Sequence, residues 1–341
     1  MITATVLLAT LLIVALVFDF LNGFHDSANV VATMIASRAM SINAALWFAA
    51  VANFLGPFLF GVAVARTVGA EVAAPEAISI AVVLAALLSA SAWNVLTWRL
   101  GIPSSSSHAL IGGIVGAVFI AAGLAAIRSA GLWKIAIALI LSPLLGFLVA
   151  LIIMQLTRFA LRRAKPSANL LLSRMQIFTA LILALSHGGN DAQKTMGIIA
   201  MGLLTLGYTD HFVVPIWVIF ASAGTIGLGT VFGGKRIIRK LGAGFYRIRP
   251  IHGFTAQAAS GAVILCASLL GGPVSTTQVV SMAILGAGAA ERKSKVRWAA
   301  LNDIALAWVL TVPATALLAM PLYLLIQWLL PSLQLVKGVT P

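Results

Sequence analysis

The sequence predicts an all-α polytopic membrane protein made of two inverted-topology repeats with discontinuous or re-entrant helices, in about 10–12 transmembrane segments. Composition, charge placement and a repeated pair of motifs predict it. Of the 341 residues, 61% are hydrophobic and 9% are charged, and the mean hydropathy is +1.07. A soluble domain of this composition would expose large apolar patches. Apolar stretches of about 18 residues or more instead suit a bilayer core roughly 30 Å thick.

The net charge of +14 is unevenly distributed along the chain. Basic residues gather in three segments, 158–174, 235–249 and 292–297. This bias is typical of the cytoplasmic loops of membrane proteins. We therefore expect a multi-pass protein of the cell (inner or plasma) membrane with these three segments in the cytoplasm, and we do not expect a nucleic-acid partner.

Two polar motifs each occur twice, in the same order. Asn22-Gly-Phe-His-Asp26-Ser-Ala-Asn29 is echoed by Ser186-His-Gly-Gly-Asn190-Asp191-Ala-Gln-Lys194, so that Asp26 matches Asp191. Pro103-Ser-Ser-Ser-Ser107 is echoed by Pro273-Val-Ser-Thr-Thr277, at a similar offset along the chain. The shared order indicates a duplicated half. We expect a first repeat over 1–157, a basic linker over 158–174, and a second repeat with a C-terminal helix over 175–341.

Counting crossings from the basic segments gives the two halves opposite topology. Segment 4–37 then runs inward and segment 175–206 runs outward. Pro103 falls at the cytoplasmic side and Pro273 at the outer side. We expect the Gly- and Asn-rich motif to interrupt each long segment in the middle, because irregular backbone is tolerated at that depth where it lines a wet cavity. Inverted repeats of this kind are typical of secondary transporters.

The repeated carboxylates are the first candidates for a site. Asp26 and Asp191 lie in apolar segments, where burying a lone carboxylate costs at least ~2.5 kcal/mol unless a cation or proton accompanies it. Asn22, Asn29 and Asn190 add neutral amide groups beside them. The pattern predicts cation-coordinating or protonatable groups, and its alternative is a pair of structural carboxylates. Asp19, one turn before Asn22, fits a pathway residue and a structural residue equally.

The hydroxyl clusters are the second candidates. Each follows a proline that suits the first turn of a helix. A helix that begins inside the membrane presents unpaired N–H groups, so two such helix starts can hold a small oxyanion. The alternative is helix capping and Ser/Thr packing. The candidate hydroxyls are Ser105, Ser106, Ser107, Ser275, Thr276 and Thr277.

Lys194 lies three residues after Asp191 and can pair with it or contact an anion. The chain has no Walker loop, zinc-protease helix or G-x-S-x-G motif, so we do not expect an enzyme. An intramembrane hydrolase and an anion channel remain the alternatives from other classes.

These motifs together resemble the inorganic phosphate transporter (PiT) family, and the likeness runs essentially end to end. The resemblance implies cation-coupled uptake of inorganic phosphate by an inverted-repeat carrier. It also implies that Asp26 and Asp191, with their Asn neighbours and the Ser/Thr runs, form the substrate and ion site. Inorganic phosphate and the lipid bilayer are thus the expected partners, with a homodimer as an open alternative.

The chain departs from sodium-coupled members of that family at two positions. It has Asn53 and Gln257 where they carry glutamates, which weakens a sodium site and favours proton coupling. We keep both residues as coupling-ion candidates, and we expect no cofactor besides a coupling cation, H⁺ or Na⁺. Some relatives carry sulfate, so a sulfate permease of the same fold is the main alternative.

Overall fold

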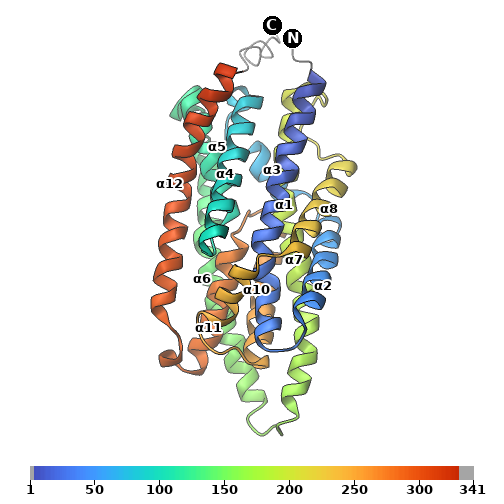
Figure 1. The fold of residues 1–341 in the computed structure, drawn as a ribbon, viewed down its shortest axis with the longest axis vertical. Helices are drawn as coiled ribbons and strands as arrows, with labels where there is room; N and C mark the ends of the chain where they lie inside the picture. The colour runs from blue at the N-terminus through green and yellow to red at the C-terminus, as the bar shows by residue number, and fades with distance from the viewer. Residues whose placement is uncertain (1–3, 330–341) are drawn as a thin grey trace.

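A computed structural model of the chain describes residues 4–329, and these residues form the expected all-helical structure (Figure 1). Residues 330–341 of the predicted second repeat lie outside this range. In chain order the helices are α1 (Ala4–Ala36), α2 (Ile42–Leu55), α3 (Ala63–Ala70), α4 (Ile80–Leu100), α5 (Ser106–Ala122), α6 (Ser129–Ala160), α7 (Ala168–Thr205), α8 (Ile216–Phe232), α9 (Lys235–Ala243), α10 (Pro250–Leu269), α11 (Thr276–Glu291) and α12 (Trp298–Leu329). Short 3-10 helices cover Gly56–Phe58, Pro75–Ala77, Leu124–Ala126 and Lys293–Lys295.

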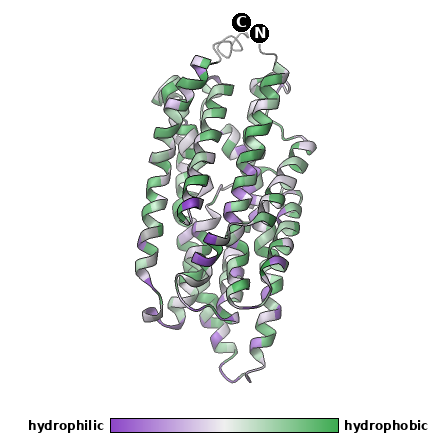
Figure 2. Ribbon diagram, viewed as in Figure 1, coloured by the Kyte–Doolittle hydropathy of each residue, from purple (hydrophilic) through white to green (hydrophobic). Residues whose placement is uncertain are grey.

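Several of these helices are long and apolar enough to cross a membrane. Within residues 4–329 they are α1, α4, α6, α7 and most of α12. Five described helices pass this test, and up to seven spans result if the α2–α3 pair and the α8–α9 pair are each counted as one span. Each pair is bent by 76° at its break. Green, hydrophobic residues run along most helices, and hydrophilic residues gather near the lower end and in the middle (Figure 2). The remaining predicted segments are helices too short or too polar to meet that test.

The polar motifs do not interrupt the helices that carry them, contrary to expectation. α1 and α7 are continuous over 33 and 38 residues. The motif glycines instead allow close helix packing. A Cβ at Gly23 would lie 2.3 Å from the Ile226 carbonyl oxygen, and one at Gly188 would lie 2.2 Å from the Asn53 carbonyl oxygen. The discontinuities lie at the α2–α3 and α8–α9 breaks.

Two helical hairpins approach each other from opposite ends of the molecule. α4 and α5 occupy the upper half, and α10 and α11 the lower half (Figure 1). Each first helix is followed by a left-handed glycine, Gly101 with φ 65° and Gly271 with φ 71°, which only glycine adopts readily. The hairpin tips touch, because Ser107 Oγ donates a 2.9 Å hydrogen bond to the Val274 carbonyl oxygen.

This contact corrects the predicted depths of the two proline motifs. Counting every apolar segment as a full crossing put Pro103 and Pro273 on opposite sides. The Ser107–Val274 bond shows that the two motifs meet. At 17 and 16 residues, α5 and α11 are short for a span of about 20 residues, so the hairpins turn back inside the molecule.

Each half of the chain supplies a helix that covers the other half's short helix. α5 packs against α12, and α11 packs against α6. Small residues make both contacts close: a Cβ at Gly116 would lie 2.2 Å from the Ala316 carbonyl oxygen, and one at Gly286 would lie 2.3 Å from that of Phe147. The two hairpin tips are thereby held in the interior, beside α1 and α7.

Candidate functional site

The two repeated carboxylates lie together although they come from opposite halves of the sequence. Asp26 comes from the middle of α1 and Asp191 from the middle of α7, two helices that pack against each other. One ligand atom from each of Asp26, His187 and Asp191 lies within 4.8 Å of the others, and all three residues are buried. The structure therefore brings the two Asp motifs together in the interior.

Hydroxyl groups from both hairpin tips bond to these carboxylates. Ser106 Oγ at the start of α5 lies 3.3 Å from Asp26 Oδ2. Thr277 Oγ1 at the start of α11 donates to Asp26 Oδ1 at 3.1 Å. Thr276 Oγ1 lies 3.2 Å from Asp191 Oδ2 and 3.5 Å from Asp26 Oδ2, so it bridges the two carboxylates. The two carboxylates and the two hydroxyl-bearing helix starts therefore lie together in the interior.

The other candidate hydroxyls serve the hairpins themselves. Ser105 is the N-cap of α5 and accepts a hydrogen bond from His108 N at 3.2 Å. Ser275 is the N-cap of α11 and accepts from Gln278 N at 3.4 Å. Capping of this kind satisfies one of the free N–H groups of a helix start. Ser107 contacts the other tip, as described above, so these three side chains fix the hairpin tips.

The three motif asparagines each keep one unused polar atom. Asn22 Oδ1 accepts from Ser106 Oγ at 2.7 Å, Asn29 Nδ2 donates to Thr277 Oγ1 at 2.9 Å, and Asn190 Nδ2 donates to Ser268 Oγ at 2.8 Å. Their second amide atoms, Asn22 Nδ2, Asn29 Oδ1 and Asn190 Oδ1, are buried without a hydrogen-bond partner. Buried polar atoms are rarely left unpaired. These atoms are free to meet a ligand.

Lys194 and two histidines complete the charged cluster. Lys194 Nζ donates to Asp191 Oδ1 and also to the Val274 carbonyl oxygen, the latter at 3.1 Å, so it joins α7 to the second tip. His25 Nδ1 is 2.7 Å from Asp26 Oδ1, and His187 Nε2 is 3.2 Å from Asp191 Oδ2. Both histidines were absent from the predicted set. Their signal was their spacing, one residue before Asp26 and four residues before Asp191.

Asn53 and Gln257 form an outer layer bonded mainly to hydroxyls. Asn53 Nδ2 donates to Thr230 Oγ1 at 2.9 Å, and its Oδ1 lies 3.2 Å from His187 Nδ1. Gln257 bonds to Thr179 Oγ1 and to Thr33 Oγ1, each at 2.9 Å. Asn53 thus reaches Asp191 through His187, whereas Gln257 reaches α1 one turn beyond Asn29.

The cluster is closed to bulk solvent. The exposed fraction of Asp26, Asp191 and Lys194 is at most 1%. Carboxylate, amide and hydroxyl oxygens are the ligands that hard cations prefer, and the starts of α5 and α11 supply free backbone N–H groups for an anion. The same cluster therefore offers oxygens to a cation and N–H and O–H donors to an anion.

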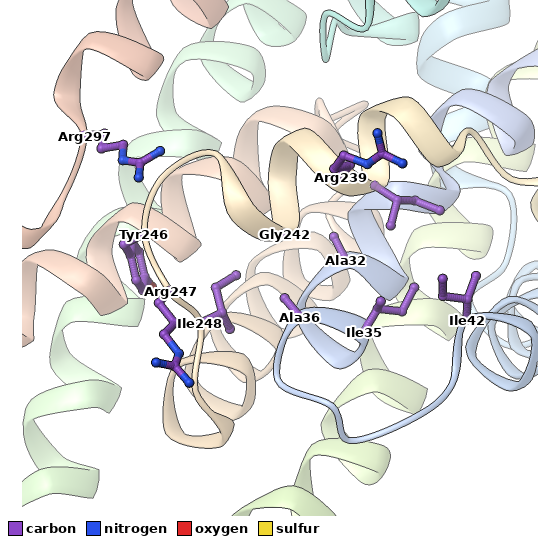
Figure 3. Close-up of a pocket in the computed structure, with 11 residues that line it drawn as sticks. Ala32, Ile35, Ala36, Ile42, Arg239, Gly242, Tyr246, Arg247, Ile248 and Arg297 are labelled. Carbon is purple, nitrogen blue, oxygen red and sulfur yellow. The ribbon is translucent and has the colours of Figure 1, made fainter.

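A separate cavity of about 510 Å³ has none of these residues in its lining. Ala32, Ile35 and Ala36 of α1 line one side, and these residues begin one turn beyond Asn29 (Figure 3). The exposed arginines Arg239, Arg247 and Arg297 border it from α9 and from two of the basic segments. The cavity thus extends from the end of α1 to the basic part of the surface.

Comparisons with known proteins agree on one family. The model of the phosphate transporter family matches residues 22–319. A probable low-affinity inorganic phosphate transporter of Rhizobium meliloti (strain 1021) is 44% identical over 92% of this chain and 94% of its own length. One from Bacillus subtilis (strain 168) is 43% identical over 94% of this chain and 98% of its own length.

A solved structure, described as the sodium-dependent phosphate transporter, has a similar fold. Its TM-score is 0.88 at 23% sequence identity, over 94% of this chain and 99% of that one. At this identity the likeness concerns the fold.

Proposed function

The chain belongs to the phosphate transporter family, and from this premise we propose that it imports inorganic phosphate by alternating access, coupled to a cation, with the proton favoured over sodium. Its relatives are transporters, so it is not an enzyme. One observation carries the proposal: hydroxyls from two opposed helix starts contact two buried carboxylates. The rest of the proposal follows from the chemistry of that contact.

We propose that phosphate binds between the starts of α5 and α11. Helix starts carry unpaired N–H groups and the positive end of the helix dipole, which favour an oxyanion. Thr276 and Thr277 now donate to the carboxylates and Ser106 donates to Asn22 Oδ1, and all three hydroxyls can turn to the anion. Lys194 adds a positive charge, and the free Nδ2 of Asn22 adds a further donor.

A cation must bind before or with the anion. Asp26 and Asp191 repel phosphate at short range in a medium where charges are weakly screened. Lys194 offsets one of the two charges. Protonation or cation binding at the carboxylates removes the remaining repulsion and so couples the cation gradient to uptake. The free Oδ1 atoms of Asn29 and Asn190 are the amide oxygens available to that cation.

Alternating access suits the arrangement of the two halves. α1 runs downward and α7 runs upward in Figure 1, and the two hairpins enter from opposite ends. We propose that the halves are inverted repeats, that the three basic segments are cytoplasmic, and that 1–157 and 175–341 rock about the closed site. The cavity of Figure 3, whose lining begins one turn beyond Asn29, would then open toward the cytoplasmic surface.

Two features of the site favour phosphate over sulfate as the substrate and the proton over sodium as the coupling ion. Phosphate near neutral pH carries an O–H that can donate to an ionised carboxylate, whereas sulfate does not, so a central carboxylate that stays ionised favours phosphate. Asn53 and Gln257 are neutral amides and their hydrogen bonds go largely to hydroxyls, which leaves little negative charge to hold sodium outside the central cluster.

Uptake into proteoliposomes tests the proposal. We expect labelled phosphate to accumulate above its external concentration when an inward proton gradient is imposed, and sulfate to be taken up poorly. A sodium gradient imposed alone should drive little accumulation. Equilibration without accumulation would indicate a channel, and a preference for sulfate would indicate a sulfate permease.

A further inference from the structure

A third buried carboxyl group lies on α1, apart from the two central carboxylates. Asp19 precedes Asp26 by seven residues, which is about two turns and about 10 Å along the helix axis. Its side chain is 0% exposed. Thr195 Oγ1 on α7 donates to Asp19 Oδ1 at 2.9 Å, whereas Oδ2 is buried without a hydrogen-bond partner. One carboxyl oxygen is thus satisfied and the other is not.

Two charged groups act on Asp19, and both belong to α7. They are Asp191 and Lys194, next to Thr195 in sequence. Lys194 is already bonded to Asp191 and to the second hairpin tip. Among the described side chains no basic group forms an ion pair with Asp19. Of the other helices packed against α1, α2 and α8 contain no ionisable residue. α4 carries the exposed Arg99 and α9 carries Arg236, Arg239 and Lys240, and none of these is among the groups that act on Asp19. Asp19 therefore has no counter-charge of its own.

An ionised carboxylate in this position is unfavourable. A buried charge without a partner is resolved by pairing with a cation or by taking up a proton. A metal ion needs several oxygen ligands, and a hydroxyl of Thr195 is the one polar side-chain group bonded to Asp19 in the described part of the chain. A proton needs only the free oxygen, Oδ2. The surroundings therefore suit a proton.

We propose that Asp19 carries a coupled proton in addition to the neutralisation of the two central carboxylates; this inference rests on the proposed function. A proton from the extracellular water binds the Asp19 carboxylate while the site is open to that side. The O–H bond breaks when the site opens to the cytoplasm, and the proton passes to water there. No other reactant is consumed.

Lys194 supplies the electrostatic link between proton and anion. When Asp19 is ionised, its negative charge attracts Lys194 and repels an incoming anion. When Asp19 is neutral, Lys194 keeps its bond to Asp191 and its attraction to Asp26, and an incoming anion is repelled less. Protonation of Asp19 therefore favours phosphate binding, and by linkage phosphate binding favours protonation.

Asp19 has no counterpart in the second half of the chain. When Asp26 is aligned with Asp191, the position that matches Asp19 is Ala184. The duplicated pair Asp26 and Asp191 serves both halves, whereas Asp19 belongs to one. We expect this group to contribute one proton per cycle.

The variant Asp19→Asn tests the inference because it fixes a neutral side chain of the same shape. In proteoliposomes, exchange of external for internal labelled phosphate needs no net proton movement and should stay within about twofold of wild type. Proton-driven accumulation should fall at least about tenfold. The control Asp210→Asn makes the same change on an exposed residue and should leave both measurements unchanged. Retention of proton-driven accumulation by Asp19→Asn would overturn the inference.

Thr195→Val supplies a second test that leaves the carboxyl group intact. It removes the hydroxyl that stabilises ionised Asp19, so Asp19 should hold its proton to higher pH. The pH profile of phosphate uptake should shift upward relative to wild type measured with the same substrate. An unshifted profile, together with loss of exchange in Asp19→Asn, would also reject a proton-carrying role.

Wild-type measurements separate failure of this inference from failure of the proposed function. If a sodium gradient alone drives accumulation, phosphate import is retained as the function and a proton-carrying role of Asp19 is rejected. If phosphate accumulates under neither gradient, the proposed function and the Asp19 inference are both rejected.

Discussion

Asp26 is the residue on which most of the site depends. Polar side chains from its own helix, from α5 and from α11 contact its two oxygens. Asp191 has fewer hydroxyl contacts but is paired with Lys194. The two carboxylates are therefore not equivalent, although the repeat places them at matching positions. The asymmetry indicates different consequences for their loss.

Asp26→Asn and Asp191→Asn should each reduce concentrative phosphate uptake at least about tenfold, because each removes a charge that a coupling cation must meet. Asp191→Asn should also lower the melting temperature, since it leaves Lys194 as an unpaired buried charge. Uptake and thermal unfolding in detergent measure the two effects. The exposed change Asp210→Asn is the control, and normal uptake in either buried variant would exclude the ion role.

The sequence predicted the residues of the site better than their roles. A repeated Asp in an apolar segment has few explanations, so Asp26 and Asp191 could be identified from the sequence. His25 and His187 could not be separated from ordinary buried histidines, because imidazole orientation depends on tertiary packing. Ser105 and Ser275 share a motif with Ser106 and Thr276, and only the backbone direction at each helix start shows which hydroxyl caps the helix.

At the scale of elements, glycines explain an incorrect prediction. Gly116 and Gly286, which follow the Ser/Thr motifs, allow close helix approach. Glycines in the Asp motifs were expected to break their helices. Gly23 and Gly188 instead give room for neighbouring backbone, and the helical hydrogen bonds continue through them. Sequence alone does not distinguish a glycine that bends a helix from one that admits a neighbour.

Gly286→Ala tests this packing role. Its Cβ would lie 2.3 Å from the Phe147 carbonyl oxygen, so α11 and α6 must separate, at a cost of about 1–3 kcal/mol of unfolding free energy. Thermal unfolding in detergent should show a lowered melting temperature. Gly224→Ala in α8 is the matched control, because nothing lies within 4 Å of its added Cβ. Helix propensity should leave that variant as stable as wild type or slightly more stable.

At the scale of the whole molecule, the repeat order could be predicted but the path of the chain could not. Counting crossings from the basic segments assumes that every apolar segment crosses the bilayer. α5 and α11 do not fit this assumption, because each begins in the interior as the second helix of a hairpin. The two hairpin tips meet through Ser107 and Val274, which are far apart in the chain. A local sequence pattern does not predict such a contact.

Labelling of single cysteines tests the proposed orientation. The only cysteine, Cys266, is first replaced by serine. Ser167→Cys lies in the connection before α7 and Asp210→Cys in the connection after it, both exposed, at opposite ends of a spanning helix. A membrane-impermeant maleimide added to intact cells should label Asp210→Cys. Ser167→Cys should react only after permeabilisation, and the reverse pattern would invert the topology.

The exchange of covering helices between the halves has a consequence for biosynthesis. α5 is inserted early, yet the helix that covers its glycine surface, α12, ends the described chain at Leu329. Until α12 is in place, Gly112 and Gly116 remain without the backbone that fits against them. A chain shortened before α12 would therefore leave the glycine surface of α5 uncovered, and we expect it to be less stable than the chain that carries α12.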